Sequence, residues 1–174
     1  ARMTGDSINF DKERVIFHVD LDAFYVEVER QNDPNLRGKA VVIGGTGPRG
    51  VVATASYEAR KFGVHSAMAT AVARRLCPDA IYMRGNHELY RDVSKKFMNI
   101  LREYSPNVVP VSVDEAYLDM TGSERLYGEP IDAADRIRKA VRDALGLPAS
   151  IGIGPNKLVA KVGSEHAKPD GVFQ

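Results

Sequence analysis

The sequence predicts an α+β fold with helices on one face of a sheet and a small basic insertion. From residue 80 the pattern runs strand, helix, two strands, helix, strand, and an apolar run at 14–20 can join the same sheet. Two segments, 86–104 and 130–145, place apolar residues three and four apart, as expected for helices with one buried face. Residues 34–76 carry seven lysines and arginines against one acid, Glu58, so we interpret them as the insertion.

The individual elements follow from local patterns along the chain. The apolar run 14–20 predicts a buried strand, and 23–30 predicts a short helix with Asp22 as its N-cap. Two apolar runs joined by GGTGPRG predict a hairpin. The remaining predictions are helical pieces at 57–63 and 67–76, a strand at 80–84, two strands within 107–122 that meet near Asp114-Glu115, a strand at 149–154 and a helix at 156–166.

Composition and charge place the chain among ordinary globular proteins. It has 174 residues, of which 44% are hydrophobic and 27% charged, with a net charge of +1. No apolar run approaches the ~18 residues that span a bilayer, and the first ten residues, ARMTGDSINF, lack the apolar core of a signal peptide. We therefore expect no membrane partner. The single cysteine, Cys77, rules out an internal disulfide and fits a cytoplasmic location.

Acidic residues stand where two predicted strands end. Asp20 is the last residue of the predicted strand at 14–20, and the pair Asp114-Glu115 lies between two apolar strands. If these strands are neighbours, two carboxylates ~4 Å apart repel by about 4 kcal/mol at an effective dielectric of 20. Mg²⁺ or Mn²⁺ would relieve that repulsion with an all-oxygen ligand set. The alternative is a solvated turn at Asp114-Glu115 and, at Asp22, only a helix cap.

Candidates for phosphate binding are found in the basic segment and the last helix. The glycine-rich turns GGTGPRG and IGIGPNK lack the ending of a P-loop, so neither predicts a phosphate site by itself. Tyr57 and Arg60 are three residues apart at a helix start and could present a hydroxyl and a guanidinium to a triphosphate, joined by Lys161. Taken separately, residues of these types more often have only a surface role. With the acids, they favour phosphoryl or nucleotidyl transfer by a two-metal mechanism.

Four motifs together resemble the Y-family DNA polymerases, and the bacterial DinB branch in particular. They are HVDLDAFYVEVER, ATASYEARKFGV, VSVDEAYLDMTG and SIGIGPNKLVAKVGSEHAKPDG, which cover nearly the whole chain in the family's order and spacing. The resemblance implies a ferredoxin-like palm formed by residues 1–33 and 77–174, and a fingers domain at 34–76.

The resemblance also implies roles for individual residues. Asp20 and Asp114 would hold two Mg²⁺ ions, helped by the backbone carbonyl of Leu21, and Glu115 would complete the catalytic site. Asp22 is not a metal ligand in this family, which agrees with a capping role. Tyr25 matches the steric gate, an aromatic ring beneath the nucleotide sugar that excludes a 2′-hydroxyl. The other residues implied in nucleotide binding are Phe24, through its backbone, and Thr54, Tyr57, Arg60 and Lys161.

The implied function is error-prone translesion synthesis during DNA repair, in which dNTPs are added to a primer 3′-hydroxyl on template DNA. Family members continue into a thumb and a little-finger domain and commonly bind a sliding clamp, so the chain ending at Gln174 is expected to be a catalytic-core fragment that has lost most of its DNA affinity. Whether this fragment is active alone stays open. Two alternatives stay open. One is a nucleotide cyclase with a palm-like fold, and the other is a non-catalytic fragment that binds Mg²⁺ and dNTP.

Overall fold

The computed structural model describes residues 13–174 of the chain. The predicted absence of a signal segment in the first ten residues therefore lies outside the described part. Internal contacts divide the described chain into two compact units. Residues 13–20 and 98–174 form the first unit, and residues 21–97 form the second. No helix of the described residues is long and apolar enough to cross a membrane.

The first unit contains a five-stranded sheet with the strand order β5-β6-β1-β7-β8. β6 pairs antiparallel with both β1 and β5, and β8 lies parallel to β7. All six residues of β1 and of β7 are buried, as their apolar sequences predict for strands in the middle of a sheet. The strands are β1 (Ile16–Leu21), β5 (Val108–Ser112), β6 (Glu115–Asp119), β7 (Ala149–Gly154) and β8 (Val172–Phe173).

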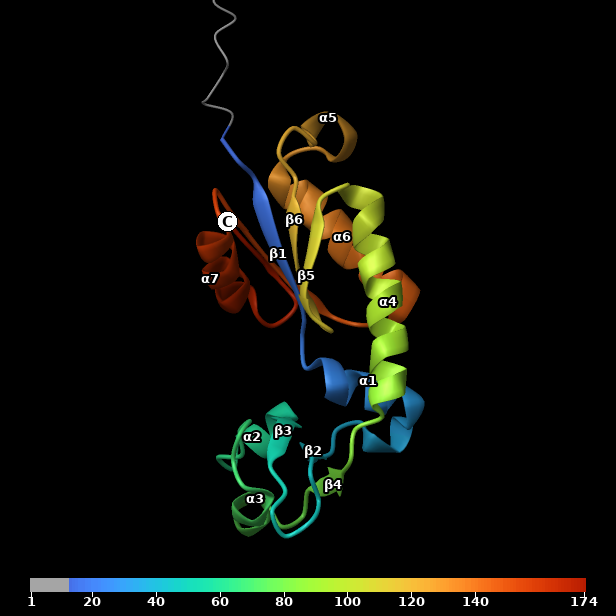
Figure 1. The fold of residues 1–174 in the computed structure, drawn as a ribbon, viewed down its shortest axis with the longest axis vertical. Helices are drawn as coiled ribbons and strands as arrows, with labels where there is room; N and C mark the ends of the chain where they lie inside the picture. The colour runs from blue at the N-terminus through green and yellow to red at the C-terminus, as the bar shows by residue number, and fades with distance from the viewer. Residues whose placement is uncertain (1–12) are drawn as a thin grey trace, which may run out of the picture. The chain divides into compact units, whose positions relative to one another are not determined.

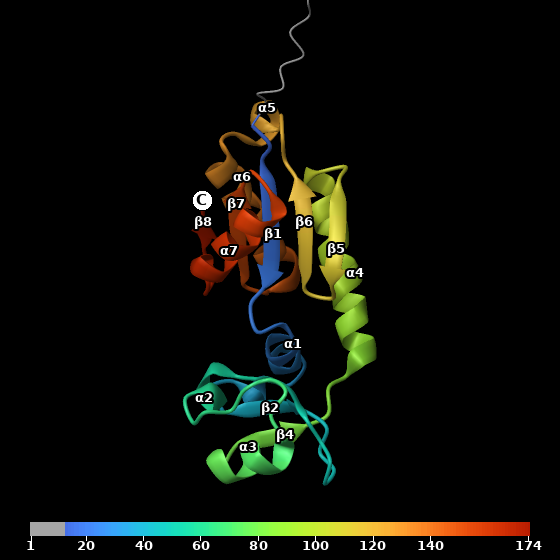
Figure 2. The ribbon, with the colours of Figure 1, turned by 60° about the vertical axis from the view of Figure 1, so that its left-hand side comes forward.

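Helices cover both faces of this sheet, whereas the sequence predicted helices on one face only. Figures 1 and 2 show α6 (Pro130–Leu145) on one side of the strands and α7 (Lys157–Ala167) on the other. Gly152 of β7 makes the close contact with α7 possible, because a Cβ there would lie 1.9 Å from the carbonyl oxygen of Ala160. The α+β class itself is confirmed. The first unit also includes the short helix α5 (Glu124–Tyr127) and residues 98–104 of α4 (His87–Tyr104).

The second unit contains a three-stranded sheet with the order β3-β2-β4. β2 (Val41–Gly44) and β3 (Val52–Ala55) form the predicted hairpin. β4 (Ile81–Met83) was predicted to belong to the larger sheet, and this is wrong, because it pairs parallel with β2. Its apolar side chains pack on a cluster of buried residues from α1, the following turn and β2. The helices are α1 (Phe24–Asn32), η1 (Pro34–Leu36, a 3₁₀ turn), α2 (Tyr57–Arg60), α3 (Thr70–Leu76) and the first part of α4.

Helix α1 begins one residue later than the sequence predicted, and its cap differs. The residue before the helix is Ala23, which adopts a left-handed conformation with φ 46° and has no side-chain group that could cap the helix. Asp22 is buried but lies in the turn that precedes this position, so the prediction that Asp22 is the N-cap is wrong. A left-handed residue at the cap turns the chain more sharply than the extended cap conformation that an aspartate usually adopts.

Arg30 joins α1 to the segments that follow it. Its side chain is 8% exposed and donates hydrogen bonds to the carbonyls of Leu36 and Lys39 and to the carboxylate of Glu58, at 3.3, 2.8 and 2.9 Å. A buried guanidinium bonded at three places beyond its own helix fixes the geometry of the elements that it joins. α1 therefore forms part of the same compact unit as the basic segment. The predicted palm and fingers boundaries, at 33/34 and 76/77, differ from the unit boundaries and stay predictions.

Asp170 provides a test of stability in the first unit. Burial alone would raise the pKa of its carboxyl group, but hydrogen bonds from Arg142 and Arg138 outweigh burial and hold this pKa below its usual value. A lowered folded-state pKa contributes stability above the unfolded-state pKa of ~3.9, and that contribution disappears as pH falls through the folded-state pKa. Replacement by asparagine, which tolerates the φ of 50° at this position, keeps the backbone and removes the charge.

We expect Asp170→Asn to lower the free energy of unfolding by about 1 kcal/mol at pH 7. Urea denaturation at pH 7 and pH 3 measures this difference, which should shrink toward zero at the lower pH. Asp143→Asn is the matched control, because Asp143 forms an exposed ion pair with Lys139 on α6 and should change stability very little. An equal loss at both pH values for Asp170→Asn would contradict the ion-pair explanation.

Candidate active site

The predicted acidic residues of the first unit meet at one end of its sheet. β1 and β6 are neighbours, as the sequence required, and their register places Asp20 directly opposite Glu115. Asp114 lies in the turn between β5 and β6, immediately before Glu115. Asp20 is 6% exposed, whereas Asp114 and Glu115 are half-buried. Three carboxylates therefore gather on adjoining strand ends, and the turn that contains Asp114 is only partly exposed to solvent.

Neutral side chains hold two of these carboxylates. The Nε2 of His18 lies 3.0 Å from Oε1 of Glu115, and its Nδ1 lies 2.6 Å from the hydroxyl of Ser164 on α7. The hydroxyl of Ser112 lies 2.8 Å from Oδ1 of Asp114 and 3.2 Å from Oε2 of Glu115, to which it can donate. His18 is fully buried, and burial, the largest cause, lowers its pKa, so it acts here as a neutral hydrogen-bonding group.

A lysine provides the positive charge next to Asp20, the most buried of these three acids. The Nζ of Lys168 lies 2.9 Å from Oδ2 of Asp20 and 3.5 Å from Oε1 of Glu165. Lys168, His18 and Ser112 were not among the predicted site residues. Lys168 could have been noticed, since it lies near the end of the last of the four motifs, shortly after a predicted helix.

The carboxylates of this cluster are strongly influenced by burial and by one another. Burial raises the pKa of Asp20 to about 7, although the bond from Lys168 opposes this shift and the charges of Asp114 and Glu115 add to it. Burial is also the largest cause of the raised pKa of Asp114. A pKa raised in this way indicates that the negative charges are incompletely compensated by the protein. An additional cation beside Asp20 and Asp114 would relieve this repulsion.

The donor set fits a hard divalent cation. Asp20, Asp114 and Glu115 offer only oxygen atoms, the ligands preferred by Mg²⁺ and Mn²⁺. Among the residues that the structure describes, no three His, Cys, Asp or Glu side chains stand as a group ready to hold a metal ion. The ammonium of Lys168 is bonded to Asp20 in this arrangement. Leu21, whose carbonyl is a predicted ligand, follows Asp20 as the last residue of β1.

Phe24 and Tyr25, both implied in nucleotide binding, lie at the start of α1 in the second unit. Phe24 is buried, so its side chain packs in the interior of this unit. The ring of Tyr25 stacks on Tyr90, with ring centroids 4.3 Å apart and planes 28° apart. Tyr25 also lines a pocket of about 390 Å³ whose other walls come from β2, β3 and the segment before α4. The wall residues are Ile43, Gly44, Gly45, Thr46, Gly47, Val51, Ala53, Arg84, Gly85 and His87.

The predicted phosphate-binding residues occupy both units. Thr54 of β3, Tyr57 and Arg60 lie close together in the second unit, where the guanidinium of Arg60 stacks over the Tyr57 ring at 5.1 Å and donates to the carbonyl of Ala55 at 2.9 Å. Tyr57 and Arg60 are exposed and therefore accessible to a ligand. Lys161 is exposed on α7 in the first unit, and its charge contributes to the lowered pKa of His18.

Comparison with known proteins identifies the class to which this chain belongs. The model of the impB/mucB/samB family matches residues 19–165, which include the acidic cluster, Tyr25 and Lys161. The chain therefore belongs to this family, and the resemblance to Y-family DNA polymerases inferred from the four motifs is confirmed.

Individual relatives make the relationship more specific. The chain is 48% identical over 161 residues to DNA polymerase IV of Treponema denticola and 52% identical over 159 residues to that of Dehalococcoides mccartyi. These matches cover 92% and 91% of this chain but only 41% of each relative. Among solved structures, DinB from Sulfolobus solfataricus aligns with a TM-score of 0.86 at 34% identity, covering 91% of this chain and 47% of that one. An insertion ternary complex of Dbh DNA polymerase aligns with a TM-score of 0.85 at 34% identity, covering 91% and 48%.

Proposed function

We propose that this chain is the catalytic part of a translesion DNA polymerase that adds dNTPs to a primer 3′-hydroxyl under the direction of a template. The observation that carries the proposal is the meeting of Asp20, Asp114 and Glu115 at the ends of β1 and β6, in a family whose relatives include DNA polymerase IV. Because the chain spans 41% of those relatives, DNA binding, lesion bypass, a sliding-clamp partner and a cytoplasmic location are proposals for the whole protein.

In the proposed reaction the oxygen of the primer 3′-hydroxyl attacks the α-phosphorus of a dNTP, and pyrophosphate leaves. Asp20, Asp114 and Glu115, with the carbonyl of Leu21, would hold two Mg²⁺ ions. When bound, these ions supply a lowered pKa for the attacking hydroxyl and charge neutralisation for the triphosphate. His18 and Ser112 keep the carboxylates of Glu115 and Asp114 in place through the hydrogen bonds described above.

Polar side chains and the backbone would hold the nucleotide. The exposed hydroxyl of Tyr57 and guanidinium of Arg60, with Thr54 and the backbone at Phe24, would bind the triphosphate oxygens, and the ammonium of Lys161 would add positive charge. The ring of Tyr25 would lie beneath the sugar, where a 2′-hydroxyl would clash with it. We propose on this basis that Tyr25 selects deoxyribonucleotides over ribonucleotides.

The proposal is tested by primer extension with the 174-residue chain itself, in Mg²⁺, beside Treponema denticola DNA polymerase IV as the positive control. We expect extension that depends on template and Mg²⁺, at a rate below that of the control. A parallel reaction with ATP or GTP but without primer tests the nucleotide cyclase alternative. A cyclic nucleotide product in that reaction, with no primer extension, would overturn the polymerase assignment. Nucleotide binding without either product would favour a non-catalytic role for this chain.

A further inference from the structure

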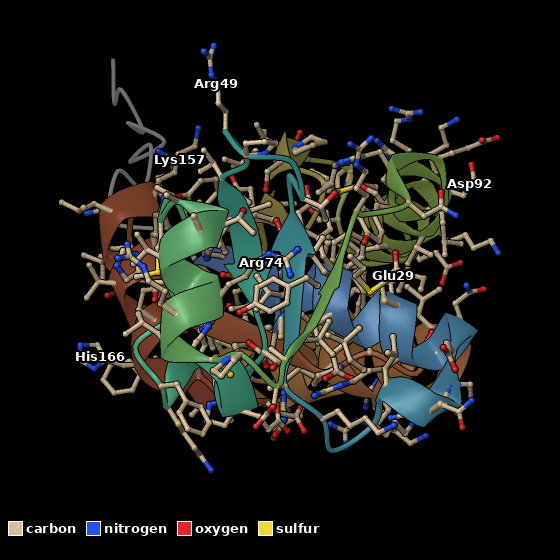
Figure 3. The ribbon with its side chains drawn as sticks, turned by 90° about the horizontal axis from the view of Figure 1, so that it is seen from below. Glu29, Arg49, Arg74, Asp92, Lys157 and His166 are labelled. Atoms are coloured by element: carbon tan, nitrogen blue, oxygen red, sulfur yellow. The ribbon has the colours of Figure 1, made fainter. Side chains whose placement is uncertain are left out.

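A buried carboxylate in the second unit lies outside the machinery described above. Glu29 lies on α1 and is labelled in Figure 3. It is 4% exposed. Its Oε1 accepts a hydrogen bond of 2.6 Å from the hydroxyl of Tyr90 and another of 3.1 Å from the backbone N–H of Asn86. Burying a carboxylate costs free energy unless hydrogen bonds compensate for the lost hydration. These two hydrogen bonds therefore stabilise Glu29 in its buried position.

Glu29 joins α1 to the first turn of α4. The side chain of Asn86 accepts from the N–H of Leu89 at 3.1 Å, and the carbonyl of Asn86 accepts from the N–H of Tyr90 at 3.0 Å, so Asn86 caps the helix. The Glu29 carboxylate thus lies at a helix N-terminus, where the helix dipole favours negative charge. One oxygen atom therefore fixes both the start of α4 and the hydroxyl of Tyr90.

Tyr90 is the residue against which Tyr25 stacks, and its ring has little freedom to move. It is 1% exposed, with Tyr25 at 4.3 Å on one side and the His87 ring edge-on at 5.5 Å. A Cβ at Gly85 would lie 2.7 Å from its Cε2 atom, so the chain backbone closes another side. The hydroxyl end is held by Glu29. Contacts therefore run without interruption from Glu29 through Tyr90 to Tyr25.

We propose that Glu29 is a positioning residue for sugar selection: through its hydrogen bond to Tyr90 it holds the surface on which the Tyr25 ring rests. The proposal rests on the gate role of Tyr25 proposed above. Glu29 itself would touch neither nucleotide nor metal. Burial, together with the Glu29 carboxylate, raises the pKa of Tyr90, so its hydroxyl stays protonated and able to donate throughout the usable pH range.

The test compares variants that differ in the hydrogen bond to Tyr90. Glu29→Leu removes the acceptor, Glu29→Gln keeps an acceptor oxygen, and Tyr90→Phe removes the donor while keeping the stacked ring. Glu27→Gln is the matched control on the same helix, because Glu27 bonds Arg30 at 3.4 Å instead. Two quantities are measured on the 174-residue chain: the ring resonances of Tyr25 by NMR with labelled tyrosine, and the ratio of the affinities for dGTP and GTP in Mg²⁺.

We expect Glu29→Leu and Tyr90→Phe to shift the Tyr25 resonances and to lower the dGTP-to-GTP affinity ratio by roughly fivefold to tenfold, the effect of one hydrogen bond. Glu29→Gln should change the ratio by less than about twofold, and Glu27→Gln should change neither quantity. Gly85→Ala provides an independent perturbation, since it pushes on the Tyr90 ring without touching Glu29, and should act in the same direction. If Glu29→Leu fails to fold, Tyr90→Phe and Gly85→Ala decide the question.

Unchanged Tyr25 resonances in the folded Glu29→Leu or Tyr90→Phe variant would overturn the proposal. An unchanged affinity ratio in those variants, when Tyr25→Ala does alter it, would also overturn it. If Tyr25→Ala itself leaves the ratio unchanged, the gate role is wrong and the role of Glu29 in sugar selection is overturned with it. In that case a shift of the Tyr25 resonances in Glu29→Leu would still support its positioning of the ring, so the two failures are distinguishable.

Discussion

Alanine in place of Asp20 or Asp114 is expected to reduce template-directed primer extension by at least about 10³-fold, equivalent to ~4 kcal/mol of transition-state stabilisation. The reason is that these two acids provide most of the negative charge at the end of β1 and β6, where Asp20 lies opposite Glu115. If either acid is replaced, the carboxylate oxygens that remain in the cluster would bind divalent cations poorly. Single-nucleotide incorporation at saturating dNTP, with Mg²⁺ varied, measures the loss.

Asp119→Asn is the matched control for this experiment. Asp119 belongs to β6 as well, but it pairs with Ile16 at the opposite end of the strand pair. Its Oδ1 accepts from the N–H of Thr121 at 3.0 Å, a bond that asparagine can keep. Full activity in Asp119→Asn would show that losing an acid from β6 is not harmful in itself. Extension at the parent rate in Asp20→Ala or Asp114→Ala would refute the assignment of the metal-binding acids.

Tyr25→Ala is expected to lower the preference for dNTPs over rNTPs by at least about 100-fold, because an alanine leaves room for the 2′-hydroxyl. The ring of Tyr25 is fixed by its stacking on Tyr90, so the space that it occupies is well defined. The ratio of kcat/KM values for a dNTP and the matching rNTP measures the preference. Incorporation of the dNTP itself should change much less than that of the rNTP.

Two further variants separate the ring from other effects of the substitution. Tyr25→Phe keeps the ring and should keep the preference, which would assign the selection to sterics and not to the phenolic hydroxyl. Tyr104→Ala removes an aromatic residue from the first unit, where Tyr104 contacts Tyr127 at 5.0 Å, and should leave the preference unchanged. A preference that survives in Tyr25→Ala would remove Tyr25 from the proposed selection of the sugar.

The local elements were largely predictable from the sequence. The predicted helix at 130–145 and strand at 149–154 agree with α6 and β7 residue for residue. Pro130 at the start of α6 and the left-handed Gly146 after its end mark the helix boundaries in the chain itself. The hairpin of β2 and β3 was likewise indicated by its glycine-rich turn. These signals are local, because they depend on residues a few positions apart.

The errors concern features that depend on distant partners. β4 reads as an ordinary short strand, and only its pairing with β2 decides to which sheet it belongs. The position of α7 depends on the close approach of Gly152 to Ala160, which a Gly-x-Gly pattern does not reveal. Asp22 has the residue type of a helix cap, but the left-handed turn at Ala23 shifts the cap position. Residue preferences are thus overridden wherever tertiary contacts set the backbone.

In the acidic site, too, some features were predictable from the sequence and others depend on distant residues. Asp20, Asp114 and Glu115 could be proposed from the sequence because acids rarely follow apolar strands without a reason. The partners of these acids could not be predicted. Lys168 contacts Asp20 and His18 contacts Glu115, and no sequence periodicity connects these parts of the chain. Glu29 reads as one more exposed glutamate on a helix, and its burial beneath Tyr90 is visible only in the structure.

The hydrogen bonds of Arg30 have a practical consequence for building chimaeras between members of this family. An exchange that replaced only residues 34–76 would take the residues at positions 36, 39 and 58 from the other family member, while Arg30 came from this chain. The arginine and its three acceptors Leu36, Lys39 and Glu58 would then no longer come from the same protein. An exchange of residues 21–97 would transfer the arginine and all three acceptors together. A segment exchanged between family members should therefore begin before α1. We expect chimaeras joined there to express and fold more often than chimaeras joined at residue 34.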